Sequence, residues 1–435
     1  MLSVEPRIDH RMTSGRKGAD SLGIFANTVD RPSTPKPKMK TAKADADKAV
    51  MQNRKARYQL QRAAQGLLPQ ERVAHCQRST MSVSGVAVYR SANGASYGNL
   101  TTCGSVWHCP ICAAKITEGR RQELQGAINA WAASGGTVYL MSLTFPHQIN
   151  QPLKNNLDLF SGALTKFKQS KLYRNVMAAV GSAGSIRSME VTHGVHGWHP
   201  HTHDLVFAKP GQLELLQTLQ MAWIETLIKV GIADRSQIND MLKAAFDVQN
   251  GDYAAEYVAK FGHEATEASK TITENHWGAS SEMTKSYAKV GKRLGGRTPF
   301  TLLADYIKGD KASGELFTEF GLCFKGKRQL FWSPKLTAAL KLLGYDRHEK
   351  TDEEIAAEPM AERELVMVLP SEDWKLVLSR NARFQVLDAA DKGGKEAVEK
   401  LLQELAGRKQ THQGVYCYQE YGGHKYNRPY LVEMH

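Results

Sequence analysis

Alternating histidines in one short segment set the strongest limit on how this chain folds. The segment HPHTHDLVF (199–207) ends in an apolar run that is typical of a strand. Side chains at positions i and i+2 of a strand point to the same face, so His201 and His203 project together, as two ligands of one cation must. His199 shares that face, but it precedes Pro200 and is a weaker candidate.

A second strand candidate, SIRSMEVTH, precedes this segment and is separated from it by a turn that contains glycine. With the turn centred between Val195 and His196, antiparallel pairing places Glu190 opposite His201, and such partners lie about 5 Å apart. We therefore predict that Glu190, His201 and His203 form one cluster. Two imidazoles and a carboxylate would leave open positions on Mg²⁺ or Mn²⁺ for phosphate oxygens. The alternative is a histidine-rich surface hairpin without an ion.

Four of the six cysteines are clustered, and two of them form the CPIC unit. In a large chain, a CxxC unit with further cysteines nearby indicates a metal site more than disulfides. We predict a closed structural zinc site with four thiolate ligands, Cys76, Cys103, Cys109 and Cys112. Two alternatives remain open: His108 or His75 as the fourth ligand, or four buried thiols without a metal.

The segment GDYAAEYVAKF (251–261) predicts a helix that carries Tyr253, Tyr257 and Lys260 on one face. A tyrosine hydroxyl has a pKa of about 10 and is a poor nucleophile at neutral pH. It needs an electrophile polarised by a metal, or a nearby cation such as Lys260. The alternative is an aromatic core stripe formed by Tyr253, Tyr257 and Phe261.

Charge and hydropathy narrow the range of partners. The chain carries 57 Lys and Arg against 44 Asp and Glu, a formal net charge of +13, which favours a polyanion, nucleic acid before membrane. No run of about 18 apolar residues predicts a membrane span. The N-terminus lacks the apolar core of a secretory signal. We therefore expect a cytoplasmic protein with no membrane partner.

In their order along the chain, these motifs resemble those of rolling-circle replication initiators of the HUH endonuclease superfamily, above all the plasmid Rep proteins. The resemblance covers roughly residues 76–335. YLMSLTF (139–145) is similar to the first strand motif of the family, HPHTHDLVF to its His-hydrophobe-His motif, and EYVAK (256–260) to its Tyr-x-x-Lys motif. CGSVWHCPIC and FKGKRQLFWS are also similar to segments of plasmid Rep proteins. Thr202 is less apolar than the usual central residue.

The resemblance implies an α+β fold, in which a ferredoxin-like HUH nuclease domain, a central antiparallel sheet with flanking helices, follows an N-terminal zinc-binding module. It implies that His201 and His203, helped by Glu190, hold Mg²⁺ or Mn²⁺ at the scissile phosphate of a plasmid origin. Tyr257 would then act as the nucleophile of a site-specific single-strand DNA endonuclease and strand transferase. The products would be a 5′-phosphotyrosine intermediate and a free 3′-OH that primes rolling-circle DNA replication, with Lys260 stabilising the phenolate or the phosphate.

Several alternatives stay open within this resemblance. Tyr253 lies four residues before Tyr257, a spacing that some initiators and related transposases use for nicking and closing, so it is the second candidate nucleophile. Glu256 could instead activate water, although its position does not match relatives that use a glutamate. A two-tyrosine HUH transposase and a non-catalytic zinc-containing DNA-binding regulator are the competing functions.

The predicted partners are plasmid origin DNA, single-stranded or supercoiled, with a host helicase and a DNA polymerase. The chain has no Walker-type phosphate-binding loop, so we expect no helicase motor of its own. Periodicity predicts helices over 46–73, 113–133, 153–180, 211–230 and 234–246, a hairpin within 81–102, a strand over 137–145 and a strand pair within 321–333. We expect four parts: a disordered basic arm (1–45), a helix plus a cysteine-rich zinc-binding module (46–135), the HUH endonuclease domain (136–345) and a small C-terminal accessory region (346–435).

Overall fold

The computed structural model describes residues 39–251, 296–347, 349–359 and 362–407 of the chain, with side chains from residue 53 onward. The predicted tyrosine helix and most of the predicted basic arm lie outside these residues. The described part is a mixed α+β structure with two antiparallel sheets, which confirms the predicted α+β class. Among the described helices, none is both long enough and apolar enough to cross a membrane.

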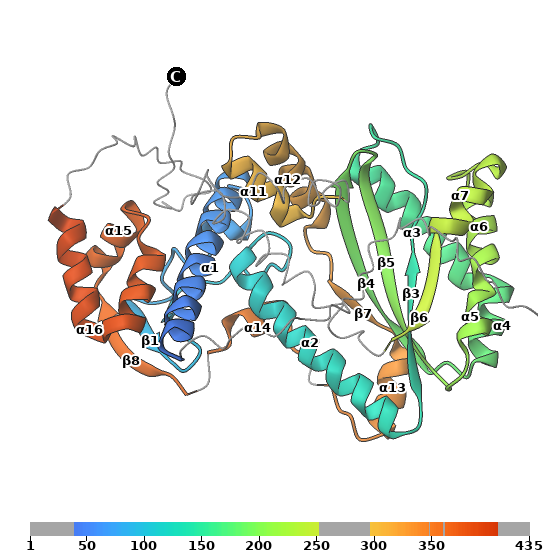
Figure 1. Ribbon diagram of the computed structural model, residues 1–435, viewed down its shortest axis with the longest axis horizontal. Helices are drawn as coiled ribbons and strands as arrows, with labels where there is room; N and C mark the ends of the chain where they lie inside the picture. Colours follow the sequence, from blue (N-terminus) through green and yellow to red (C-terminus); the bar gives the residue numbers. More distant parts are fainter. Residues whose placement is uncertain (1–38, 252–295, 348, 360–361, 408–435) are drawn as a thin grey trace, which may run out of the picture. The chain divides into compact units, whose positions relative to one another are not determined.

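The larger sheet has five strands in the order β6-β3-β5-β4-β7 (Figure 1). Every neighbouring pair in it is antiparallel. Its long central strands, β4 and β5, are the two strands predicted around the histidine segment. The bounds are β3 (Thr137–Leu143), β4 (Gly184–Gly194), β5 (Gly197–Ala208), β6 (Phe246–Asn250) and β7 (Leu330–Trp332).

The register of the β4–β5 hairpin agrees with the sequence prediction. Gly194 pairs with Gly197, which leaves Val195 and His196 as the two-residue turn. Counting back from that turn, Glu190 lies opposite His201. Because strand side chains alternate between faces, this register decides which side chains share a face of the sheet.

One face of the larger sheet is covered by α3 (Leu153–Gln169), α6 (Leu219–Lys229) and shorter helices. Apolar side chains from the strands and these helices form a common core, which includes Tyr139, Phe160 and Trp223. The helix predicted over 153–180 is two helices, because the Ser170 side chain accepts the backbone N–H of Tyr173 and starts α4 (Lys171–Ala179). The shorter helices on this side are α5 (Leu213–Gln217), η2 (Arg235–Gln237) and α7 (Ile238–Ala244).

The opposite face of the sheet is covered at one end by α2 (Pro110–Ala133) and α13 (Pro334–Leu342). Leu124 of α2 and Leu336 of α13 are buried in one cluster with Leu205 and Phe207 of β5. These β5 residues share a face with His203 because they follow it at intervals of two. The part of this face that carries His201 and His203 therefore lies outside the apolar cluster formed with α2 and α13.

The smaller sheet joins segments that lie far apart in the sequence. Its order is β2-β1-β8, formed by β1 (Val86–Arg90), β2 (Ser96–Gly98) and β8 (Glu364–Leu369). The β1–β2 pair confirms the predicted hairpin, and β8 comes from the region after residue 345. The core of this sheet also contains side chains from α1 (Met39–Leu67), α15 (Ser371–Ser379) and α16 (Arg383–Gly407). The division into four parts remains a prediction. β1, from the predicted zinc-binding module, pairs with β8, from the predicted C-terminal region.

The strand pair predicted within 321–333 is wrong in its first half. Residues up to Phe324 complete α12 (Lys311–Phe324), where Phe320 and Phe324 are fully buried, and only the residues of β7 form a strand. Their spacing of four residues places Phe320 and Phe324 on the same buried face of a helix, and this burial outweighs their strand propensity. The remaining elements are η1 (Arg72–His75), α11 (Pro299–Ile307) and α14 (Asp352–Ala357).

Candidate metal sites

The structure brings together Glu190, His201 and His203, the three residues predicted to form one cluster. The Oε2 atom of Glu190 lies 3.2 Å from Nε2 of His201 and 3.8 Å from Nε2 of His203. The potential ligand atoms of the three residues all lie within 4.8 Å of one another. This group, called the histidine cluster below, has the spacing needed to hold one metal ion.

Backbone and side-chain contacts orient both imidazole rings of the histidine cluster. The Ser142 hydroxyl lies 2.8 Å from Nδ1 of His203, and Nδ1 of His201 lies 3.3 Å from the backbone oxygen of His199. Both contacts use the Nδ1 atoms, so the Nε2 atoms are directed toward Glu190. Hydrogen bonds of this kind fix the orientation and the tautomer of histidines that bind metals.

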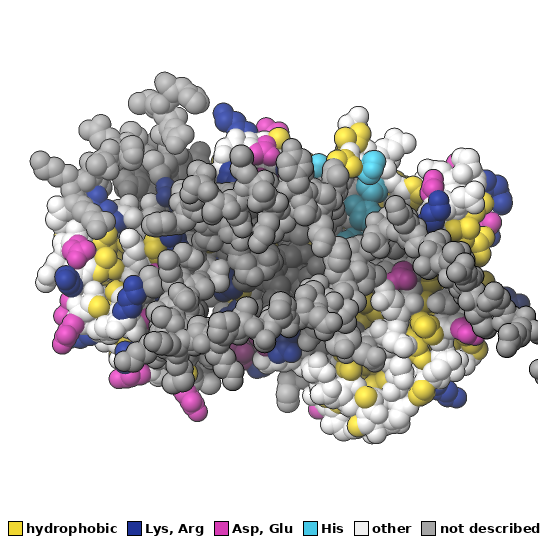
Figure 2. Space-filling model, in the orientation of Figure 1, with side chains coloured by type: hydrophobic (Ala, Val, Ile, Leu, Met, Phe, Trp, Pro, Cys, Tyr) yellow, Lys and Arg dark blue, Asp and Glu magenta, His cyan; other side chains and the backbone are white. Residues whose placement is uncertain are grey.

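The donors of the histidine cluster fit a divalent cation that also binds oxygen ligands. Two imidazole nitrogens and one carboxylate fill only part of an octahedral coordination shell. The side chains of His203 and Glu190 are 4% and 9% exposed, while that of His201 is 17% exposed. Figure 2 shows histidine side chains on one face of the molecule. Because the His201 side chain is partly exposed, a ligand could approach a cation held in this cluster.

His199 lies next to the histidine cluster but is held by other groups. Its ring centre is 5.3 Å from that of His201, its Nε2 lies 3.1 Å from the Thr144 hydroxyl, and its Nδ1 lies 3.3 Å from Nδ1 of His147. Burial, together with the neighbouring His201 and His147 rings, lowers the pKa of His199 to about 3. His199 is therefore neutral at physiological pH, and it does not belong to the group of ligand atoms within 4.8 Å of one another, in keeping with its weaker prediction as a ligand.

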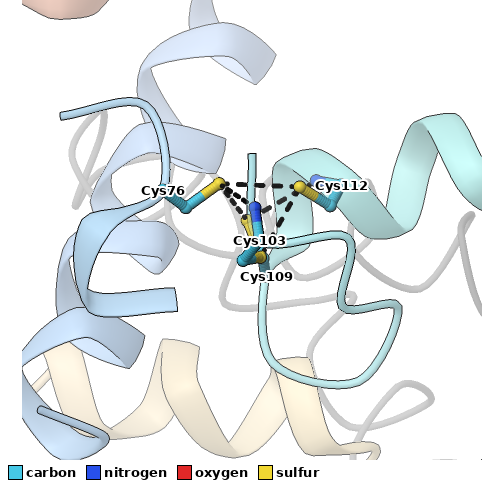
Figure 3. A group of neighbouring side chains, drawn as sticks. All are labelled: Cys76, Cys103, Cys109 and Cys112. Carbon is cyan, nitrogen blue, oxygen red and sulfur yellow. Dashed lines mark hydrogen bonds between the residues drawn. The ribbon is translucent and has the colours of Figure 1, made fainter. Parts of the chain in front are cut away.

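The four predicted cysteines meet in a second cluster, called the cysteine cluster below (Figure 3). All four are buried free thiols. The Sγ atom of Cys112 lies 3.6 Å from that of Cys76 and 3.6 Å from that of Cys103, and Sγ of Cys109 lies 3.7 Å from that of Cys76. A tetrahedral zinc ion with bonds of about 2.3 Å to sulfur requires sulfur atoms roughly 3.8 Å apart. The cluster fits such an ion.

The local structure around α2 favours negative charge on the cysteine cluster. Cys109 is the N-cap of α2, Pro110 begins the helix, and the Cys109 sulfur accepts the backbone N–H of Cys112 at 3.5 Å. Burial opposes charge on Cys109, but hydrogen bonds from the other three thiols and from that N–H hold its pKa well below the ordinary value. The positive end of a helix dipole acts in the same direction.

The alternative histidine ligands lie outside the cysteine cluster. Nε2 of His108 lies 2.9 Å from the backbone oxygen of Gly321 and is directed toward α12. Neither His108 nor His75 belongs to the group of ligand atoms within 4.8 Å of one another in the described structure. The cysteines alone supply four ligands.

The predicted residues Tyr253, Tyr257 and Lys260 lie outside the described residues. Their roles remain predictions. Two side chains near the clusters, Ser142 and Gln61, were not predicted. Ser142 lies in the predicted strand YLMSLTF, but its pairing with His203 depends on the β3–β5 register, which no local pattern indicates.

Comparison with known proteins gives two relatives. A protein of Streptomyces lividans named Protein rep is 25% identical over 381 residues, which cover 73% of this chain and 80% of the relative. A protein of Streptomyces cyanogenus named neomycin resistance protein is 30% identical over 149 residues, 28% of this chain and 34% of that protein. No family model and no solved structure matches the chain. The predicted resemblance is confirmed at this level, and the chain is a relative of a Rep-type replication protein.

Proposed function

We propose that the chain initiates rolling-circle replication by nicking one strand at a plasmid double-strand origin. The proposal combines the relative named Protein rep, which matches 73% of this chain, with the histidine cluster on β4 and β5. The cluster is the observation that carries the proposal. Its three ligands leave coordination positions of a divalent ion open for phosphate oxygens, and a DNA-binding protein without catalysis has no need for such a site. The assignment of the larger sheet to a ferredoxin-like HUH nuclease domain belongs to the same proposal.

In this proposal Glu190, His201 and His203 hold Mg²⁺ or Mn²⁺. The bound ion would supply positive charge at the scissile phosphate. The protein orients the ligands before DNA binds, since Ser142 fixes the His203 ring and the β4–β5 register fixes Glu190. Such preorganisation lowers the cost of reaching the transition state.

Tyr257 is the proposed nucleophile and Tyr253 the second candidate, as the resemblance to the HUH family implies. Asn250 at the end of β6 pairs with Tyr139 of β3, in the same sheet as the histidine strand β5. The described chain therefore reaches this sheet directly before the segment that carries both tyrosines.

Attack by the Tyr257 oxygen on the phosphorus would form the 5′-phosphotyrosine bond and break the bond to the 3′ oxygen. The phenol would give up its proton to solvent, and the 3′ oxygen would take up a proton and leave as the free 3′-OH. Lys260 would stabilise the phenolate or the phosphate. A host helicase and a DNA polymerase would then act on the nicked origin.

We further propose that the cysteine cluster holds a structural Zn²⁺. Four thiolates complete a tetrahedral shell, and a closed shell of this kind stabilises a fold without taking part in catalysis. The sulfur atoms are buried among residues of α1, α2 and α12, which belong to one apolar core. Metal analysis of the purified protein that finds no zinc would reject this site.

A nicking assay tests the proposed activity. Supercoiled plasmid carrying the cognate origin, incubated with the protein and Mn²⁺, should become nicked and covalently attached to protein. Tyr257→Phe should give no detectable product, and His203→Ala should lose most activity because a ligand is removed. His196→Ala is the matched control, since His196 is exposed in the turn of the same hairpin, and it should nick normally.

The same assay separates the competing functions. A non-catalytic regulator would bind origin DNA but leave it intact. Normal nicking by Tyr257→Phe would refute the assignment of Tyr257 as the nucleophile. A two-tyrosine transposase would cut the ends of an insertion element in preference to a plasmid origin. Full activity of a variant that combines His201→Ala and His203→Ala would refute the metal site.

A further inference from the structure

Arg383, the first residue of α16, is a buried arginine. It is 7% exposed, and its guanidinium lies 4.9 Å from the centre of the Tyr58 ring. Its Nη1 donates to Oε1 of Gln61 at 2.8 Å and to the backbone oxygen of Gln77 at 3.1 Å. Within the described part of the chain these acceptors are neutral, and the side chain forms no ion pair within 4.0 Å.

Gln61 connects Arg383 to the cysteine cluster. This glutamine of α1 is fully buried. While its Oε1 accepts from Arg383, its Nε2 donates to the Cys109 sulfur at 3.4 Å and lies 3.5 Å from the backbone oxygen of Cys76. The guanidinium thus polarises an amide whose N–H is directed at a sulfur atom, and hydrogen bonds in such chains strengthen one another.

Arg383 and the cysteine cluster, at the two ends of this series of hydrogen bonds, carry complementary charges. A buried cation is costly unless a negative group compensates it. Four thiolates around one divalent ion carry two net negative charges, which is the compensation that Arg383 otherwise lacks among its described contacts. Four protonated thiols would supply none.

We propose that Arg383 is a positioning residue for the cysteine metal site. It acts through Gln61, holding the amide donor on the Cys109 thiolate and offsetting the negative charge of the metal-bound cluster. The inference rests on the zinc site proposed above. It gives a function to a region after residue 345 in which the sequence shows no recognisable chemistry.

The test measures zinc release from the full-length protein to a chromogenic chelator. Arg383→Met and Gln61→Met should each speed release by about 10- to 100-fold, the usual effect of losing an outer contact to a metal ligand. Arg383→Lys should restore part of the retention because it keeps the charge. Arg62→Met is the matched control, since Arg62 is exposed on the same helix, and it should release zinc at the wild-type rate.

Two further readouts separate this role from simple packing. In the cobalt-substituted protein, the sulfur-to-metal charge-transfer band should shift in Gln61→Met and stay in place in Arg62→Met. The double variant should release zinc no faster than the faster single variant, because both changes interrupt one chain of contacts.

Wild-type zinc release by Arg383→Met would overturn the proposal, and so would a double variant whose effect is the product of the two single effects. If Arg383→Met fails to fold with zinc present, Gln61→Met becomes the deciding variant. An unchanged zinc release rate and an unchanged charge-transfer band in Gln61→Met would overturn the proposal. A wild-type protein that binds no zinc would instead refute the zinc site, and the role of Arg383 with it.

Discussion

At the scale of single residues, the histidine cluster depends on how its rings are held. The Ser142 hydroxyl lies 2.8 Å from Nδ1 of His203, and this leaves Nε2 directed toward Glu190. Ser142 itself is not one of the three predicted ligands. Its contribution should therefore appear in cation affinity, with little effect on the fold.

We expect Ser142→Ala to weaken Mn²⁺ binding by about 10- to 100-fold, because the ring of His203 loses its orienting partner. Electron paramagnetic resonance of free Mn²⁺ during a titration measures the dissociation constant. Ser185→Ala is the control, since Ser185 lies on β4 an odd number of residues from Glu190 and so faces the other side of the sheet. Equal affinities for Ser142→Ala and wild type would contradict this role.

Local patterns predict the ligands themselves but not the residues that support them. Glu190 could be placed opposite His201 because a short hairpin relates the two by counting from its turn. Ser142 and Gln61 reach their partners across contacts between distant segments, and no periodicity specifies those contacts. The same limit applies to Arg383, which lies 322 residues from Gln61 in the sequence.

At the scale of elements, the β4–β5 hairpin sets the register on which the cluster depends. Its turn ends at Gly197, whose φ of +83° favours glycine. A Cβ atom at this position would lie 2.7 Å from the backbone oxygen of Ile149. The turn therefore needs glycine both for its backbone conformation and for the space beside it.

We expect Gly197→Ala to destabilise the protein by about 1–3 kcal/mol, from the left-handed backbone and the contact with Ile149. Gly162→Ala is the matched control: it lies on the exposed side of α3, where an added methyl group would meet nothing within 4 Å, and it should stabilise by roughly 0.5–1 kcal/mol. Thermal unfolding of the two variants gives the comparison. A higher melting temperature for Gly197→Ala than for wild type would show that the turn tolerates a side chain.

Elements with strong periodicity were predictable, and their ends and neighbours less so. The strands of the histidine hairpin and the helix α2 follow the patterns of their segments. Near residue 170 the apolar spacing continues, but a serine side chain caps a new helix there and divides the segment. Within 321–333, burial of Phe320 and Phe324 against other elements favours a helix where a short apolar run resembles a strand.

At the scale of the whole molecule, the region after residue 361 forms one core with the elements around the cysteines. β8 pairs with β1, and Leu369, Trp374 and Val386 are buried in the cluster that contains Val88. A salt bridge of 2.6 Å joins Arg54 of α1 to Asp388 of α16. Sequence composition did not predict this arrangement, because strand pairing across such a distance leaves no local signal.

We expect a chain that ends at Glu358 to lose zinc and to unfold at a lower temperature, because β1 loses its partner strand β8 and the core loses α15 and α16. A chain that ends at Gly407 keeps these elements and is the matched control. Metal analysis and thermal unfolding measured by circular dichroism compare the two. Full zinc content with a wild-type transition in the shorter chain would refute the structural dependence.

The most direct test of the central claim is to map the covalent bond between protein and DNA. After origin plasmid is nicked in the presence of Mn²⁺, nuclease and trypsin digestion should leave a nucleotide on the peptide 244–260, and fragmentation in the mass spectrometer should place it on Tyr257. Attachment at a residue other than Tyr257, or nicking that leaves no covalent protein–DNA bond, would contradict the account.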